Sequence, residues 1–195
     1  CPGALDFAAV RRAVGCPPDV GLLEYLAQIA DPEERSTKEA ILAAAEADAA
    51  ERCRVNPGAG ELVAFLRGRG VPMAIITRNS RAAMDRALPR LPEISPDDFV
   101  VVVTRDLPVS PTLSPKPFPD GVEFVARELG LDTAGLLMIG DHAFDIEAGR
   151  RAGTLTMFLR NDPAESRADG GADFVVDTLE QALLLIGRGL PSRPN

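Results

Sequence analysis

From residue 57 onward, short continuous apolar runs alternate with segments whose apolar residues recur at helical spacing, and this alternation limits the possible folds. The apolar runs lie at residues 71–77, 99–104, 136–140, 155–159 and 174–176, and the main helical segments at 80–88, 120–129, 144–152 and 179–186. Continuous apolar runs are typical of strands that are buried on both faces of a parallel sheet. Because strands that alternate with helices form βαβ units, the sequence predicts an α/β fold with a parallel sheet.

Residues 17–54 interrupt this alternation. The segment 20–29 is amphipathic, and Asp31-Pro32 begins a second helix that continues to about Arg54. Two consecutive helices inside an α/β chain predict an inserted helical hairpin. The sequence therefore predicts three parts: an α/β core at 1–16 and 55–188, a small two-helix cap at 17–54, and a frayed tail at 189–195.

Composition and charge exclude several classes of protein. The 195 residues carry 29 acidic and 21 basic side chains, a net charge of −8, whereas nucleic-acid-binding proteins carry clustered positive charge. No apolar run approaches the ~18 residues of a membrane-spanning helix, and no secretory signal is visible. The chain has an odd number of cysteines, Cys1, Cys16 and Cys53, and none of them has CxxC spacing. We therefore expect neither a zinc site nor a disulfide framework, and we expect the cysteines to be buried or incidental. We therefore expect a cytoplasmic protein with no nucleic-acid or membrane partner.

Polar residues follow three of the apolar runs, at the point where each predicted strand ends. Thr77, Thr104 and Asp141 occupy these positions. In open parallel sheets, ligands bind at the carboxyl ends of the strands, so these side chains are candidates for a binding site. A polar residue at a strand end also commonly forms a turn or caps a helix, and we favour that interpretation for Thr104.

Asp141 and Asp145 are the strongest candidate pair for chemistry. They follow Gly140, and their four-residue spacing can put both carboxylates on one side of the start of a helix. Two acidic groups there either stabilise the helix through its dipole or bind Mg²⁺, which takes one or two carboxylates together with substrate phosphate. Lys116, one of two lysines, lies in a proline-rich loop at 108–119. Its compact ammonium suits a single point of negative charge, although a lone lysine is more often a solvated surface charge.

Three motifs follow one another along the chain: 75–79 (IITRN), 116–117 (KP) and 140–145 (GDHAFD). In this order and spacing, the sequence resembles the haloacid dehalogenase-like hydrolases, on the phosphatase side of that superfamily and similar to phosphoglycolate phosphatases. The resemblance covers about residues 55–180, and it implies a Rossmann-like parallel sheet with a small helical cap. It also implies a Mg²⁺-dependent phosphatase that acts on a small phosphorylated metabolite through an aspartyl-phosphate intermediate.

The resemblance implies roles for residues of the first two motifs. The Thr77 hydroxyl and adjacent backbone N–H groups hold phosphoryl oxygens. Arg78 and Asn79 contact the substrate, with a purely structural role at a helix start as an equal alternative. Lys116 neutralises charge on the nucleophile and on the transferred phosphoryl group.

In the third motif, the resemblance assigns Mg²⁺ to Asp141, with Asp145 close by. His142, the single histidine, lies beside Asp141. Imidazole can transfer protons near neutral pH, but the resemblance gives this position no role. We therefore expect His142 to be a loop residue near the metal.

The nucleophile motif of the family, Asp-x-Asp-Gly-Thr at the end of a central strand, does not occur in residues 1–195. In the family, that strand lies between those that here end at Thr77 and Asp141. Neither Asp6 nor Asp19 follows a strand-like run or has an Asp two residues later. We therefore expect the nucleophile to lie upstream of this chain and the 195 residues alone to be inactive. The alternatives are a non-catalytic phosphate- or partner-binding protein, or a phosphomutase or dehalogenase of the same fold.

Overall fold

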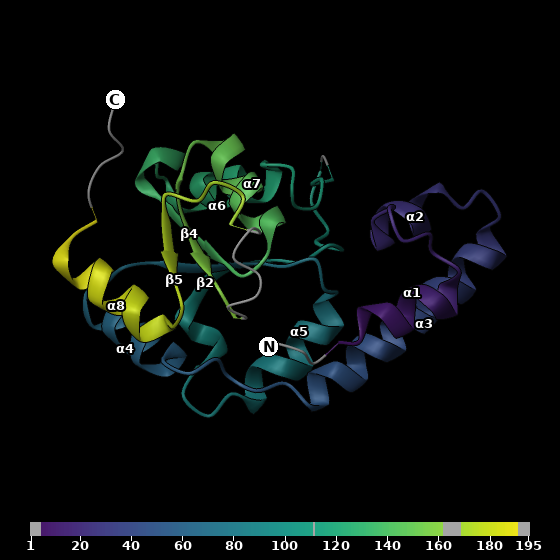
Figure 1. Ribbon diagram of the computed structural model, residues 1–195, viewed down its shortest axis with the longest axis horizontal. Helices are drawn as coiled ribbons and strands as arrows, with labels where there is room; N and C mark the ends of the chain where they lie inside the picture. The colour runs from purple at the N-terminus through teal and green to yellow at the C-terminus, as the bar shows by residue number, and fades with distance from the viewer. Residues whose placement is uncertain (1–4, 111, 162–168, 191–195) are drawn as a thin grey trace.

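The computed structural model describes residues 5–110, 112–161 and 169–190, in which helices surround parallel strands (Figure 1). The helices are α1 (Phe7–Val14), α2 (Leu22–Gln28), α3 (Pro32–Glu51), α4 (Ala59–Gly68), α5 (Arg81–Ala87), α6 (Asp120–Leu129), α7 (Ala143–Ala152) and α8 (Leu179–Arg188). The strands are β1 (Met73–Ile76), β2 (Phe99–Val103), β3 (Leu137–Gly140), β4 (Leu155–Leu159) and β5 (Phe174–Val176). Short 3₁₀ turns lie at η1 (Leu88–Arg90), η2 (Pro96–Asp98) and η3 (Thr133–Gly135).

All strand pairs in the described residues are parallel, which confirms the predicted α/β fold. β1 pairs with β2, and β4 lies between β3 and β5. Within this part of the chain the pairs form two separate sheets, because no hydrogen-bond ladder joins β1 to β3. The chain leaves β1 at Ile76 and β3 at Gly140, so Thr77 and Asp141 follow the carboxyl ends of strands in different sheets.

Helices cover the strands from two sides. α6 and α7 pack against each other, and α4 and α8 form a pair that Figure 1 shows on the opposite side of the strands. α6 approaches β1 closely through Gly121, where an added Cβ would lie 3.0 Å from Ile76 Cγ2. This contact fixes the start of α6, and therefore the end of the preceding proline-rich loop, next to the end of β1.

Strands β1 and β3 are less buried than the sequence predicts. Every residue of both strands is only partly buried, whereas 156–159 of β4 are buried. Each of the two strands has a partner strand on one edge only, within the described residues. An unpaired edge leaves one side of a strand accessible, so the prediction of strands buried on both faces is wrong for β1 and β3.

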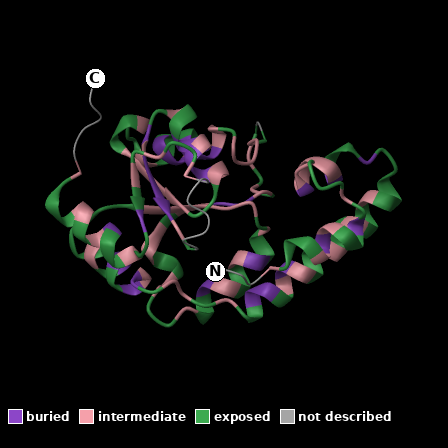
Figure 2. Cartoon of the chain, viewed as in Figure 1, coloured by how far each residue is buried: buried purple, intermediate pink, exposed green. Residues whose placement is uncertain are grey.

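Helices α1, α2 and α3 form an arm that extends to one side of the α/β part (Figure 1). Their contact is a small apolar cluster of buried residues: Val10, Val14, Leu22, Leu26, Ile29 and Leu42. Figure 2 shows that buried residues occur along this arm as well as among the strands. Residues 1–16 are predicted to belong to the α/β core, but α1, which lies within that range, packs on α3. Because α1 has only 8 residues and carries Arg11 and Arg12, its apolar face is too short to recognise by periodicity.

Two cysteines lie in the described residues. Cys16 is free, and Cys53 is disulfide-bonded. The expectation that the cysteines are incidental is therefore wrong for Cys53. None of the described helices is long and apolar enough to cross a membrane.

Candidate active site

A cavity of about 1130 Å³ is lined by every residue of β1 and every residue of β3. Apolar side chains of α4, α5 and α6 complete most of its wall. The polar residues that follow the strand ends lie at one part of the wall: Thr77, Asn79, Lys116, Asp141, His142 and Asp145, together with Asn161. Five of the predicted site residues therefore line one largely apolar cavity, whose polar part is called the mouth below, whereas Arg78 is not among its lining residues. An apolar cavity with a few polar groups is typical of ligand sites.

Thr77, directly after β1, continues the hydrogen bonding between β1 and β2 by one residue. Its backbone N–H donates to Val103 O at 2.8 Å, and its hydroxyl accepts a hydrogen bond of 3.1 Å from Asn79 N. This local bond fixes the hydroxyl beside the turn that leads to α5. Thr104, at the end of β2, is 3 % exposed, and its backbone C=O accepts a hydrogen bond of 3.2 Å from Leu107 N, as in a turn.

Lys116 joins the two sheets at the mouth of the cavity. Its ammonium donates to Ile76 O at 2.7 Å and to Asp145 Oδ1 at 2.5 Å. The side chains of Lys116 and Asp145 are 12 % and 8 % exposed, so the pair is largely removed from water. The solvated-surface interpretation of Lys116 is therefore wrong, because a buried ammonium requires such partners.

Asp145 is held in place from three directions. Its Oδ2 accepts from His142 N at 3.0 Å, which closes a capping box at the start of α7. An added Cβ on Gly140 would lie 2.2 Å from the Asp145 Cβ, so only glycine allows β3 to end this close to the carboxylate. His142 itself caps the helix, with its Nδ1 accepting from Phe144 N at 3.1 Å. The sequence identified the Gly-Asp pattern but not the capping role of the histidine.

Asp141 is the more open of the two carboxylates. It is exposed, and its Oδ2 accepts a hydrogen bond of 2.7 Å from Asn161 Nδ2. The described residues contain no group of three or more His, Cys, Asp or Glu side chains that could hold a metal. Mg²⁺ commonly binds through one or two carboxylates and completes its shell with water and substrate oxygens. The donor set at the mouth therefore fits Mg²⁺, and a fully protein-made cation cage is not present among these residues.

The comparisons with known proteins agree with this geometry. Residues 8–153 match the sequence profile described as haloacid dehalogenase-like hydrolase. The chain belongs to the haloacid dehalogenase-like hydrolase family. A phosphoglycolate phosphatase encoded on a plasmid of Cupriavidus necator is 30 % identical over 142 residues, which cover 71 % of this chain and 59 % of that protein.

Two further known proteins are similar to this chain. An N-acetylmuramic acid 6-phosphate phosphatase of Pseudomonas aeruginosa is 28 % identical over 165 residues, 82 % of this chain and 69 % of that protein. The crystal structure of a hydrolase from Pseudomonas syringae has the same fold, with a TM-score of 0.74 over 93 % of this chain and 88 % of that one, at 22 % identity. The family and fold implied by the motifs are thus confirmed.

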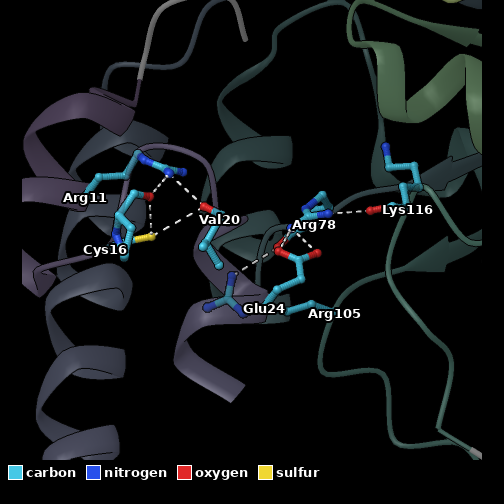
Figure 3. A network of polar contacts seen from close by, with 8 residues as sticks. Arg11, Cys16, Val20, Glu24, Arg78, Arg105 and Lys116 are labelled. Carbon is cyan, nitrogen blue, oxygen red and sulfur yellow. Dashed lines mark hydrogen bonds and ion pairs between the residues drawn. The ribbon is translucent and has the colours of Figure 1, made fainter. Parts of the chain in front are cut away.

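The hydrolase also has a polar connection between its helical arm and the site, which sequence reasoning missed (Figure 3). Arg78 Nη2 donates to both carboxylate oxygens of Glu24 in α2, at 2.9 and 2.8 Å. Nearby, Arg105 donates to Glu46 of α3 and to Arg78 O. No sequence signal pairs residues 54 and 59 positions apart, so only the folded chain reveals these contacts.

The Glu24–Arg78 pair has a defined dependence on pH. Partial burial raises the pKa of Glu24, but the hydrogen bond and charge of Arg78 outweigh it, so the net pKa lies below its ordinary value. A lowered folded-state pKa means that the pair stabilises the fold above the unfolded-state pKa and loses this effect as pH falls through the folded-state pKa.

We expect Glu24→Gln to lower the free energy of unfolding at about pH 7 by ~0.2–1 kcal/mol, the usual size for a partly exposed ion pair. The difference from the unmodified protein should narrow as pH falls through the lowered folded-state pKa of Glu24, because the carboxyl is then protonated in both states. Denaturant unfolding of both proteins at a series of pH values measures this difference in the free energy of unfolding. Glu39→Gln, a substitution at an exposed residue of α3, is the matched control and should leave the free energy of unfolding at about pH 7 unchanged.

Proposed function

We propose that this hydrolase is a Mg²⁺-dependent phosphatase of small phosphate monoesters. The observation that carries the proposal is the position of Lys116, whose ammonium bridges the end of β1 and Asp145 at the mouth of the cavity. A fixed cation of this kind attracts a phosphoryl group and neutralises the charge of an attacking carboxylate. The relatives from Pseudomonas aeruginosa and Cupriavidus necator, both phosphatases, support the same reaction class.

Each residue of the mouth has a role in this proposal. Thr77 and the backbone N–H groups that follow it hold phosphoryl oxygens, and Lys116 positions and neutralises the group in transfer. Asp141, with Asp145 beside it, would hold Mg²⁺. When bound, Mg²⁺ supplies Lewis-acid charge to the phosphoryl oxygens. Asp145 already accepts from Lys116 and His142 N, whereas Asp141 is exposed and accepts from Asn161 through Oδ2, so Asp141 is the carboxylate more accessible to a cation.

We further propose that a strand upstream of Cys1 occupies the cavity between β1 and β3 and carries the nucleophile. Both strands have an edge without a ladder in the described residues, and the cavity between them is apolar until it reaches Lys116 and Asp141. An apolar strand paired with both edges would end at that polar mouth. A carboxylate there would attack phosphorus, break the ester P–O bond to release the alcohol, and leave an aspartyl-phosphate that water hydrolyses.

The experiment compares the 195-residue chain with the same chain preceded by the residues that its gene encodes before Cys1, called the extended protein here. We expect the extended protein to hydrolyse p-nitrophenyl phosphate with Mg²⁺ and the 195-residue chain to be inactive. The extended protein should also unfold cooperatively at a higher temperature, because each buried backbone group that finds a partner avoids a cost of about 1–3 kcal/mol.

Asp141→Asn in the extended protein is the companion variant. It should lower turnover by about 10²-fold or more and weaken the response to Mg²⁺, because an oxygen ligand loses its charge. Hydrolysis by the 195-residue chain, abolished by the same substitution, would contradict the upstream nucleophile. A gene that begins at the Cys1 codon would favour the non-catalytic binding protein.

A further inference from the structure

Glu46 is a buried carboxylate of the helical arm to which the proposed reaction gives no role. It lies in the second half of α3, where this helix packs against α5 of the α/β part (Figure 1). Its side chain is 4 % exposed, so its charge requires fixed partners. Its Oε1 accepts from the Arg105 guanidinium, and its Oε2 accepts from the Ser80 hydroxyl at 2.8 Å. One carboxylate of the arm therefore joins two segments of the α/β part.

Arg105 in turn fixes the peptide groups that follow Thr77. Its Nη1, which also contacts Glu46, donates to Arg78 O at 3.2 Å, and its backbone N–H donates to Asn79 O at 3.2 Å. The C=O and N–H of a trans peptide group point in opposite directions. The peptide group between Arg78 and Asn79 therefore points its N–H away from Arg105. This N–H donates to the Thr77 hydroxyl oxygen at 3.1 Å.

The contact with Asn79 determines where the Thr77 hydroxyl can donate. Because its oxygen already accepts from Asn79 N, the hydroxyl hydrogen points toward a different acceptor. Thr77 lines the cavity together with Lys116, so a phosphoryl oxygen bound at the mouth would be such an acceptor. Glu46 is thus connected to this hydroxyl through the side chain of Arg105 and a single peptide group.

We propose that Glu46 is a positioning residue for the turn at 77–80 and that, through Arg105, it orients the Thr77 hydroxyl toward the phosphoryl group. The inference rests on the proposed phosphatase function, in which Thr77 holds a phosphoryl oxygen. The second contact of Glu46, with Ser80, holds the other end of the same turn. The helical arm then contributes to phosphate binding through α3, although Glu46 itself does not touch the substrate.

The test uses the extended protein and inorganic phosphate as a competitive inhibitor of p-nitrophenyl phosphate hydrolysis. It is done at a temperature at which circular dichroism shows each variant to be folded. Glu46→Gln keeps the size of the side chain and removes the charge that holds Arg105. We expect Ki for phosphate to rise and kcat/KM to fall by about tenfold, because small displacements of a positioned group are costly. A carboxylate that only attached the arm would leave Ki of the folded protein unchanged.

Glu51→Gln is the matched control for that substitution. Glu51 also belongs to α3 and also pairs with the α/β part, but its partner is Arg90 of η1 rather than a residue of the turn. This variant should leave both Ki for phosphate and kcat/KM unchanged. An effect as large as that of Glu46→Gln would show that any loosened contact of the arm is sufficient, which would overturn the positioning role.

A double-mutant cycle with Thr77→Val separates positioning from attachment. Valine has the shape of threonine without the hydroxyl, so no hydroxyl remains for Glu46 to orient. The protein with both Glu46→Gln and Thr77→Val should therefore have kcat/KM within about twofold of Thr77→Val alone. Effects that multiply would show that Glu46 acts independently of Thr77 and would overturn the inference.

Arg105→Lys examines the same connection with the carboxylate in place, and it decides the question if Glu46→Gln does not fold. Lysine keeps a cation beside Glu46, but its side chain ends one atom before the Nη1 position that contacts Arg78 O. Ki for phosphate should rise as in Glu46→Gln. An unchanged Ki in a folded variant would overturn the positioning role and leave the phosphatase proposal intact. Absence of p-nitrophenyl phosphate hydrolysis by the unmodified extended protein would overturn the proposed function and the inference together.

Discussion

Replacing Lys116 by methionine in the extended protein is expected to lower phosphatase turnover by about 10³-fold and the free energy of unfolding by about 3–5 kcal/mol. Both effects have the same origin. The ammonium is 12 % exposed and bonds to Asp145 and Ile76 O, so its loss leaves a nearly buried carboxylate without its cation. Steady-state kinetics and denaturant unfolding of the same preparations measure the two losses.

Lys116→Arg separates charge from shape. Arginine keeps the charge, but its planar fork is larger than an ammonium and does not fit between Ile76 O and Asp145. We expect activity to remain as low as in Lys116→Met, with a smaller loss of stability. Lys38→Arg on the helical arm is the control for turnover, because Lys38 pairs with Glu34 and donates to the Tyr25 hydroxyl rather than to a residue of the site, so activity should stay unchanged. An active Lys116→Arg protein would contradict the assigned role.

Gly140→Ala is expected to destabilise the protein by about 3 kcal/mol and to abolish most of its activity. The added methyl would lie 2.2 Å from the Asp145 Cβ, and both groups are fixed by backbone, one at the end of β3 and the other in the first turn of α7. Relief of this overlap moves Asp145 away from Lys116. Thermal unfolding and turnover of the variant check both parts.

Gly68→Ala provides the control for that substitution. Gly68 ends α4, and an added Cβ there meets nothing within 4 Å. Alanine should therefore be neutral or stabilising by up to about 1 kcal/mol, since it costs less backbone entropy in a helix. A Gly140→Ala protein with unchanged stability would show that β3 and α7 can move apart, which would remove the steric argument for this glycine.

The position of the site could be predicted because its residues follow strand ends. Thr77 and Asp141 come directly after apolar runs, and both line the same cavity although they follow strands of different sheets. Lys116 could be identified because it is one of two lysines and lies in a proline-rich loop, but its ion-pair partner, Asp145, could not be predicted. The contact with Asp145 spans 29 residues and depends on how α7 begins, which a linear pattern does not describe.

Other features of the structure could not be predicted from the sequence, each for a different physical reason. The start of α4 at Ala59 depends on Gly58, which adopts a φ of +81° at the N-cap, and hydrophobic periodicity does not describe this backbone geometry. α1 was missed because a short amphipathic helix is marginal alone and gains its stability from α3. The Glu24–Arg78 pair depends on the placement of the arm over the core, and hydrophobic periodicity carries no information about such a polar contact.

The contacts of Lys116 have a thermodynamic consequence for the association of the two sheets. Its ammonium connects a carbonyl of the β1–β2 sheet to a carboxylate that follows the β3–β4–β5 sheet. An anion that binds this ammonium only when the two sheets are associated favours the associated state over the separated one. At a free anion concentration [L], it stabilises the associated state by RT ln(1 + [L]/Kd). Under the proposed function, the free energy of unfolding therefore rises with substrate concentration, because substrate bound at the mouth stabilises the association of the β1–β2 sheet with the β3–β4–β5 sheet.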